Sequence, residues 1–472
     1  MSPLAGAPFL PVFAGWCLGI SLSPRFTPLF GAVVGTLFSL TVIFIGTRTF
    51  PPGSLVFLLL STILVAFPVY LLDSRLQEPM RINFRLEGKG TVMAERAWGG
   101  KRALILATRA GRLVCSVSPE KILWEGSTVE FKGRMASIEE LFPKRGSSFD
   151  PAAFWRCRGA RAGLRLDSIE GEKGKNGGKV AWRTRLRRRI LLSLPPLLRG
   201  HILAAWTGEK DPEVAELHAR WGTSHLLAVS GFHVGILAAF LLWCLGGFRF
   251  KLLWCSVLLW GYVFMTGFSA SACRAMCMIQ LALLGPTVAG RRSSALNAVC
   301  VAGGVLLAYN PWLFWDLGWR LSVVSALVIC SFLERGAGRH LLLASPVIWL
   351  ATAGEASRAF GTVPLAGLLL NFLALPAFSV LLPVSSIAAL PAILGIPFGR
   401  VPAIGMEGLL EAWARFADLL SALLPVKVVH TAGLVSVSAA VVGASVAFGL
   451  RMGWKRGVFF SILSVLCVFI FC

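Results

Sequence analysis

The sequence predicts an α-helical membrane protein that crosses the bilayer many times and carries one inserted β domain. Hydrophobic residues make up 56% of its 472 residues, and charged residues only 15%, whereas soluble domains carry roughly 25% charged residues. Long apolar runs lie on both sides of a polar stretch, 73–199, that is rich in Gly and Arg. These two observations indicate membrane helices interrupted by one soluble insertion.

The N-terminal part, residues 1–72, contains three successive apolar runs, at 8–22, 28–46 and 53–72. No basic stretch precedes the first run, as it would in a secretory signal peptide. We therefore expect about three transmembrane helices here.

Residues 73–181 are expected to form the β domain. Short segments with alternating apolar residues, such as Ala103–Ala107, Arg112–Cys115 and Ser127–Lys132, are separated by glycines, which is the pattern of strands and turns. Cys115 and Cys157 both lie in this domain. Outside the cytoplasm the compartment would be oxidising, so we expect them to form a disulfide.

Residues 182–223 are expected to form interfacial helices, because a dense group of arginines precedes the apolar run Ile190–Leu192. Residues 224–472 return to membrane-grade hydropathy, with an amphipathic segment at 399–427. About ten spans are expected, at 226–246, 252–269, 274–290, 294–309, 318–333, 339–353, 362–379, 380–397, 431–449 and 455–472.

The net charge of +23 favours a polyanionic partner, either nucleic acid or anionic lipid, although positive loops on the cytoplasmic side account for part of it. With a cytoplasmic N-terminus, the β domain falls outside the cell. The loops that then fall inside are basic, as expected. The arginines at 183–189 are the exception, and a polyanion at the outer face would explain them.

The segment Ser224–Gly235 places His225, Ser230 and His233 at the start of an apolar run. Because polar groups are costly in a membrane, they usually line a water-filled path or a bundle interior. On one helix, His225 and His233 would share a face. With other polar residues near the outer ends of spans, they predict a vestibule formed by His225, Ser230, His233, Ser269, Ser271, Arg274, Asp316, Arg320, Glu355, Arg358 and Asn371.

Other interpretations of these residues remain open. Asp316 with Arg320, and Glu355 with Arg358, have the spacing of local helix pairs. The histidines could simply be packed, and Ser230 with His233 could form a nucleophile and base pair. No Cys/His pattern at zinc spacing occurs, so we expect neither a metal nor another cofactor. Asn371 lies near Pro376 and Pro383, which predicts broken helices at mid-membrane, with a simple proline kink as the alternative.

Several segments together resemble the ComEC family of competence proteins, which move single-stranded DNA across the bacterial inner membrane. Ser224–Gly235 resembles the most specific family motif. Weaker resemblances follow in the family's order, at Leu123–Arg134, Ser148–Gly159, Ser269–Ala275, Asp316–Ser322 and Asn371–Pro376.

The resemblance implies an OB-like external barrel and an inner-membrane channel for DNA uptake during transformation. It also implies an external DNA receptor, a cytosolic helicase-like motor and a separate nuclease as partners, because the chain contains no H-x-H-x-D-H run and no Walker-type loop. We therefore expect no enzymatic activity. The residues expected to bind DNA are Arg183, Arg185, Arg187, Arg188, Arg189, Trp124, Lys132 and Arg134.

Two other functions stay open. One is a membrane transporter or channel for another anionic substrate, such as a lipid or a glycan. The other is a membrane-embedded hydrolase that uses Ser230 and His233, although the chain lacks a G-x-S-x-G elbow there.

Overall fold

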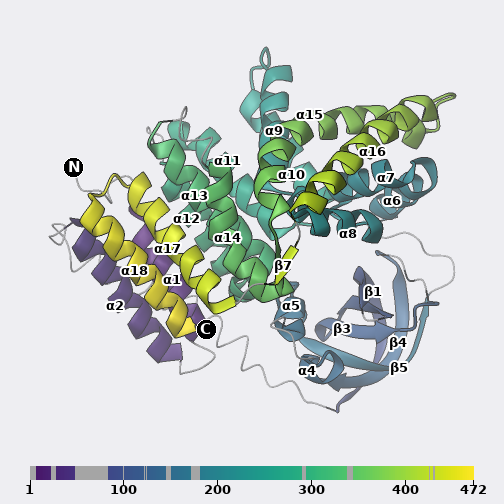
Figure 1. Ribbon diagram of the computed structural model, residues 1–472. Helices are drawn as coiled ribbons and strands as arrows, with labels where there is room; N and C mark the ends of the chain where they lie inside the picture. Colours follow the sequence, from purple (N-terminus) through teal and green to yellow (C-terminus); the bar gives the residue numbers. More distant parts are fainter. Residues whose placement is uncertain are drawn as a thin grey trace. The chain divides into compact units, whose positions relative to one another are not determined.

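The computed structural model divides the chain into two compact units (Figure 1). One comprises residues 74–192, and the other comprises residues 1–73 together with 193–472. The residues described are 7–22, 28–47, 83–98, 100–121, 123, 125–144, 150–171, 181–289, 294–336, 344–424, 426–428 and 431–471. The predicted span 53–72 lies outside them.

The smaller unit is built on a closed five-stranded barrel with the strand order β1-β2-β3-β5-β4. All neighbouring strands are antiparallel except β3 and β5, which are parallel. The predicted small β domain is therefore confirmed. The strands are β1 (Arg85–Trp98), β2 (Lys101–Thr108), β3 (Gly111–Val117), β4 (Thr128–Ala136) and β5 (Ala162–Gly171).

The apolar run in β2 is continuous because both of its faces are buried. Leu104 and Leu106 belong to the barrel interior, whereas Ala103 and Ile105 pack in a second core. That second core includes Trp155 of α5 (Pro151–Cys157) and Ile138 of α4 (Ile138–Leu141). The two short helices thus cover the outer face of the barrel wall.

The barrel needs a glycine where β4 and β5 approach most closely. A Cβ at Gly133 would lie 2.4 Å from the carbonyl oxygen of Arg165, a distance that real contacts do not reach. The register between the two strands shifts at this point. Gly133 therefore lets the barrel bend and close.

The smaller unit also contains most of α6 (Ala181–Ser193), a helix that we expected in the following segment. Arg183 forms an ion pair with Glu125 at 3.1 Å. The hydroxyl of Thr184 donates to the backbone oxygen of Glu125, also at 3.1 Å. These contacts hold the start of α6 to the loop before β4.

The larger unit is mainly helical. It comprises α1 (Leu10–Leu22), α2 (Pro28–Thr47), α7 (Pro196–Ile202), η2 (Leu203–Thr207), α8 (Pro212–Trp221), η3 (Ser224–Leu226), α9 (Gly231–Cys244), α10 (Lys251–Met265), α11 (Ala270–Ala289), α12 (Ala295–Tyr309), η4 (Pro311–Trp315), α13 (Leu317–Glu334), α14 (Ala344–Phe360), α15 (Ala366–Leu394), α16 (Arg400–Leu423), α17 (Thr431–Gly449) and α18 (Trp454–Phe471). A short pair of strands, β6 (Thr362–Pro364) and β7 (Val426–Val428), completes it.

Two of the described helices, α13 and α15, are long and apolar enough to cross a membrane. Several others, among them α9, α10 and α12, are apolar but shorter. Large apolar side chains such as Trp243, Leu253 and Val380 are exposed on these helices, as expected for surfaces that face lipid rather than water.

The helix α15 corrects the prediction of two spans, 362–379 and 380–397, with a break between them. A single helix of 29 residues runs through Pro376, Pro383 and Pro391. Each proline removes only one intrahelical hydrogen bond, and packing can hold the helix together. Phe378, which lies between the first two prolines, is fully buried and packs against Trp413 of α16.

Candidate functional site

The segment Ser224–Gly235 forms a turn followed by a helix start, not one long helix. His225 lies in the short 3₁₀ turn η3, and its side chain is exposed. Ser230 has extended backbone angles and precedes α9. The expectation that His225 and His233 share a helix face is therefore wrong, because Ser230, a favoured N-cap residue, starts the helix between them.

Ser230 and His233 cap the start of α9. The backbone N–H of Ser230 donates to Nδ1 of His233 at 3.2 Å, so this nitrogen carries no proton. The Ser230 hydroxyl lies 3.0 Å from the same nitrogen. These contacts form a capping box at the start of α9.

The start of α11 is tied to the segment that precedes α9. The hydroxyl of Ser271 donates to the backbone oxygen of Val229 at 2.5 Å. Ser269 accepts from the backbone N–H of Ala272 at 3.3 Å, which caps α11 in its turn. Two of the predicted vestibule serines thus bring the first turns of α9 and α11 together.

Arg274, one turn into α11, is buried with 6% of its surface exposed. Its Nε donates to the hydroxyl of Ser322 on α13 at 2.9 Å, and Nη1 lies 3.1 Å from the sulfur of Met278. We call Ser271, Arg274, Ser322 and the first turn of α9 the α9–α11–α13 cluster. Ser322 was not predicted as a site residue, although it ends the Asp316–Ser322 segment.

A second polar group joins α13 and α14. Asp316 caps α13 by accepting the backbone N–H of Trp319 at 2.9 Å. Arg320 forms an ion pair with Glu355 of α14 at 2.5 Å. This arginine therefore contacts a neighbouring helix, which the local spacing of Asp316 and Arg320 did not predict. Because Arg320 and Ser322 are two residues apart, they leave α13 in different directions. The predicted vestibule therefore divides into two groups.

The last two predicted vestibule residues lie later in the chain. Arg358 belongs to the last turn of α14, and Asn371 lies on α15. The side-chain oxygen of Asn371 is buried and has no hydrogen-bond partner among the described residues.

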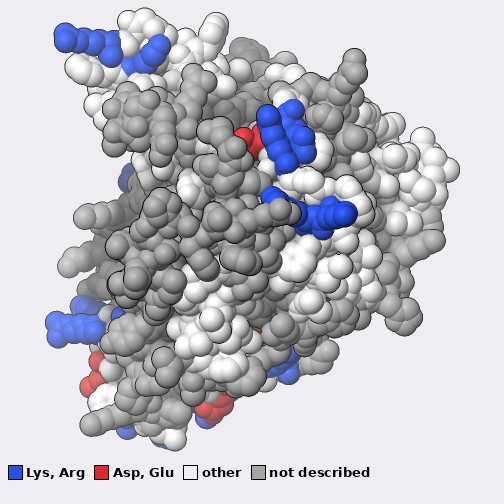
Figure 2. All heavy atoms as spheres, turned by 90° about the vertical axis from the view of Figure 1, so that its left-hand side faces the viewer, with Lys and Arg blue, Asp and Glu red and all other residues white. Residues whose placement is uncertain are grey.

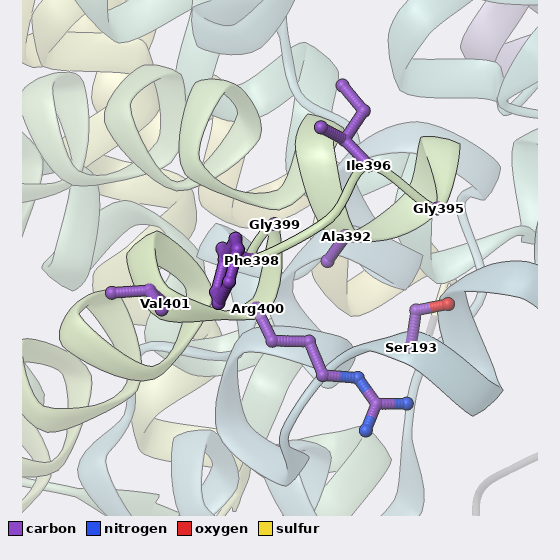
Figure 3. A pocket seen from close by; sticks show the side chains of 8 residues that line it. All are labelled: Ser193, Ala392, Gly395, Ile396, Phe398, Gly399, Arg400 and Val401. Carbon is purple, nitrogen blue, oxygen red and sulfur yellow. The ribbon is translucent and has the colours of Figure 1, made fainter.

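A pocket of about 490 Å³ lies near the C-terminal end of α15, where the chain turns into α16 (Figure 3). None of the predicted vestibule residues lines it. Its lining is formed by Ser193, Ala392, Gly395, Ile396, Phe398, Gly399, Arg400 and Val401.

The residues expected to bind DNA lie in the smaller unit and differ in their surroundings. Arg183 is largely buried in its pair with Glu125, whereas Arg188 and Arg189 are exposed. Lys132 pairs with Glu87 at 3.4 Å on the surface. Trp124 lies outside the described residues. On the face of the molecule shown in Figure 2, the described Lys and Arg side chains lie in several separate groups.

Arg134 lies in a row of arginines across three strands. It is in register with Arg85 of β1 and with Arg165 of β5, and all three are exposed. Arg165 also pairs with Glu140. Like charges directly opposite one another in a sheet are destabilising, so this row is a candidate surface for an anion.

The expected disulfide is wrong. Cys115 and Cys157 are both buried, and no disulfide joins them. Cys115 lies inside the barrel core, and Cys157 ends α5, the helix that covers the outer face of the barrel wall. The barrel wall therefore separates them. Burial raises the pKa of the Cys115 thiol to about 12.

One buried pair of histidines was not predicted from the sequence. His201 of α7 and His218 of α8 are buried and face each other. They are 17 residues apart, a separation that matches no helix or strand repeat, so only the packing of α7 against α8 reveals them. Among the described residues, no cluster of three or more His, Cys, Asp or Glu is placed to hold a metal ion.

Comparison with known proteins identifies a family that the helical unit matches. A family model described as "Competence protein" matches residues 202–456. ComE operon protein 3 of Bacillus subtilis (strain 168) is 38% identical over 139 residues, which cover 27% of this chain and 17% of that protein. The alignment thus spans less than a fifth of that relative. No solved structure matches.

Proposed function

The chain belongs to the competence protein (ComEC) family, and from this premise we propose that it forms a channel for inward passage of single-stranded DNA across the bacterial inner membrane. The observation that carries the proposal is Arg274. It is buried within apolar helices, and none of the described residues forms an ion pair with it. A buried cation without a carboxylate is costly, and a passing phosphate backbone would compensate it.

The barrel unit would capture DNA on the outer side of the membrane. Its closed order β1-β2-β3-β5-β4 is compatible with an OB-like fold, a scaffold that often binds single strands. Supporting features are the row Arg85, Arg134 and Arg165 and the exposed Arg188 and Arg189. Because such capture is electrostatic, it should weaken steeply as salt rises.

The proposed orientation has a cytoplasmic N-terminus and an extracytoplasmic barrel, with the basic loops around Lys251 and Lys455 inside. The lipid bilayer, an external DNA receptor, a cytosolic helicase-like motor and a separate nuclease complete the proposed machinery. In this proposal the chain itself transports DNA and performs no chemistry.

A transporter for another anionic substrate is the second candidate. The pocket beside α15 favours it, because Phe398 and Arg400 offer apolar surface and positive charge together. That combination suits an amphipathic anion such as a lipid. A hydrolase using Ser230 and His233 is less favoured, because the same two side chains already form the capping box of α9.

The deciding experiment is transformation of the native host after deletion of this gene, with uptake of labelled DNA measured alongside. The gene is restored as wild type, Arg274→Gln or Arg249→Gln. Arg249 is an exposed residue beyond α9, so it serves as the matched control. We expect wild type and Arg249→Gln to restore uptake, and Arg274→Gln to fail at equal protein level in the membrane.

Unchanged uptake after deletion, in a host shown to be competent, would refute the DNA channel and favour the anionic-substrate transporter. Equal loss of Arg274→Gln protein and of uptake would show that Arg274 only supports folding.

A further inference from the structure

The first turn of α9 presents backbone donors to the α9–α11–α13 cluster. The earliest N–H groups of any helix have no intrahelical acceptor. The N–H of Ser230 is satisfied by His233, whereas those of Gly231 and Phe232 lie ahead of the first intrahelical hydrogen bond. Together with the helix dipole, such groups attract an anion.

A second feature points to the same place independently. The guanidinium of Arg274 is held on one side by Ser322 and on the other by Met278. Its remaining nitrogen, Nη2, lies close to Gly231, because a Cβ built at Gly231 would lie 3.5 Å from it. A buried guanidinium, 6% exposed and without an ion pair among the described residues, is thus aimed at the first turn of α9.

Gly231 keeps this space open. A Cβ there would meet only Nη2 of Arg274 and the Cβ of Ala275, both at 3.5 Å, which is ordinary contact. An alanine at 231 would therefore fit without displacing protein atoms. It would, however, occupy the space between the guanidinium and the N–H groups. A Cβ at Gly235, one turn later, would meet no atom within 4 Å, and so this glycine offers a control substitution.

We propose that this cluster binds one phosphodiester group, with one oxygen on Nη2 of Arg274 and the other on the N–H groups of Gly231 and Phe232. The inference rests on the proposed function and deepens it. Guanidinium and backbone N–H groups both recognise phosphate oxygens without reading bases. A site for a single phosphate would let any strand pass one nucleotide at a time.

A phospholipid headgroup carries the same phosphodiester chemistry. The position of Arg274 favours the nucleic acid strand, because this side chain is buried between α11, α13 and the start of α9 and not displayed on an outward apolar face. The experiment must nevertheless distinguish the two sources.

The test uses the full-length protein in nanodiscs of zwitterionic phosphatidylcholine, which has no net charge, and a labelled oligothymidylate. Binding is measured against salt for wild type, Gly231→Ala, Gly235→Ala and Arg274→Gln. Losing one phosphate contact should reduce the slope of log K against log salt by about 0.7 for a single strand. We expect this reduction for Arg274→Gln and Gly231→Ala, and the wild-type slope for Gly235→Ala. A strand with uncharged methylphosphonate linkages should bind all four proteins alike.

Three different results would contradict, in turn, the phosphate site, the nucleic acid as its ligand, and the proposed function. If wild type binds the strand and all three variants share its slope, the phosphate site is refuted while the channel stands. If Gly231→Ala instead loses bound phosphatidylglycerol in native mass spectrometry without any change in strand binding, the site holds a lipid. If wild type neither binds the strand nor supports uptake, the proposed function itself fails.

Discussion

The Nε2 atoms of His201 and His218 lie 3.1 Å apart, in a buried hydrogen bond between α7 and α8. Its direction is fixed by the neighbours. Nδ1 of His201 must donate to the carbonyl oxygen of Leu197, 2.7 Å away, because a carbonyl only accepts. In the neutral pair, His218 therefore donates to His201, and the hydroxyl of Thr223 donates to Nδ1 of His218 at 2.8 Å. Phe378 of α15 packs against both rings.

This pair should make stability depend on pH. Burial lowers the pKa of His201, and burial together with the nearby His201 lowers the pKa of His218 to about 3. In the unfolded chain both would titrate near 6.5. Below that pH the unfolded state binds more protons than the folded state. The stability that the neutral pair contributes is therefore fully present above about pH 6.5, and the free energy of unfolding falls as the pH decreases below it.

The expected slope is up to about 1.4 kcal/mol per pH unit for each histidine, measured as thermal unfolding in detergent between neutral and mildly acidic pH. His218→Gln should flatten the slope. Arg220→Gln, an exposed change on the same helix, should leave it unchanged. A wild-type unfolding temperature that does not vary across this range would contradict the neutral pair.

Glu407 should be essential to the start of α7. Its two carboxylate oxygens accept the backbone N–H groups of Leu197 and Leu198, at 2.8 and 2.7 Å, and its side chain is buried. Glu407→Gln replaces one acceptor with a donor that faces an N–H. We expect a loss of about 1–3 kcal/mol in unfolding free energy. Glu411→Gln, on the exposed face of α16, should change it by less than about 0.5 kcal/mol, and equal effects would argue against the cap.

The ion pair of Arg320 and Glu355 should couple α13 to α14. Both side chains are largely buried, so Arg320→Gln leaves a carboxylate without its cation and should cost about 1.5–3 kcal/mol. The charge-reversed double variant, Arg320→Glu with Glu355→Arg, should recover part of that loss. Unfolding measurements on both single variants and the double variant form the cycle. Strictly additive effects would show that the two residues do not interact.

Cys115 should be unreactive in the folded protein. Its thiol is buried and its pKa is raised to about 12, so almost none of it is thiolate at neutral pH. Maleimide should leave Cys115 and Cys157 unlabelled in native membranes and reach them only after denaturation. Peptide mass spectrometry reads out each site. A requirement for reductant before these two cysteines react would restore the disulfide.

Arg134→Ala should weaken strand binding without weakening the barrel. Removing it relieves the like-charge row with Arg85 and Arg165, so thermal stability should not fall. The salt slope of oligonucleotide binding to the full-length protein should drop by about 0.7. Arg109→Ala, an exposed arginine at the turn after β2, should keep the wild-type slope, and a shared reduction would mean that only net charge matters.

Much of the architecture follows from local patterns. Short apolar segments and turn glycines were enough to predict the small barrel. β4 buries alternate side chains, as a strand with one buried face does, whereas β2 is buried on both faces. The amphipathic segment at 399–427 contains α16, whose buried residues Ala403, Met406, Leu410 and Ala417 recur at helical spacing. The continuity of α15 was not predictable in this way, since whether prolines break a membrane helix depends on what packs around it.

The sequence by itself determined the membrane class, the inserted β domain and the family, because hydropathy, strand periodicity and the Ser224–Gly235 motif are all local properties of the chain. It also identified Ser230, Ser271 and Arg274 as residues of interest. Only the tertiary structure decided their partners: Ser322 for Arg274, Glu355 for Arg320, and His218 for His201. These pairings join residues 17 to 48 positions apart, and such contacts are set by how whole helices pack, which no local pattern encodes.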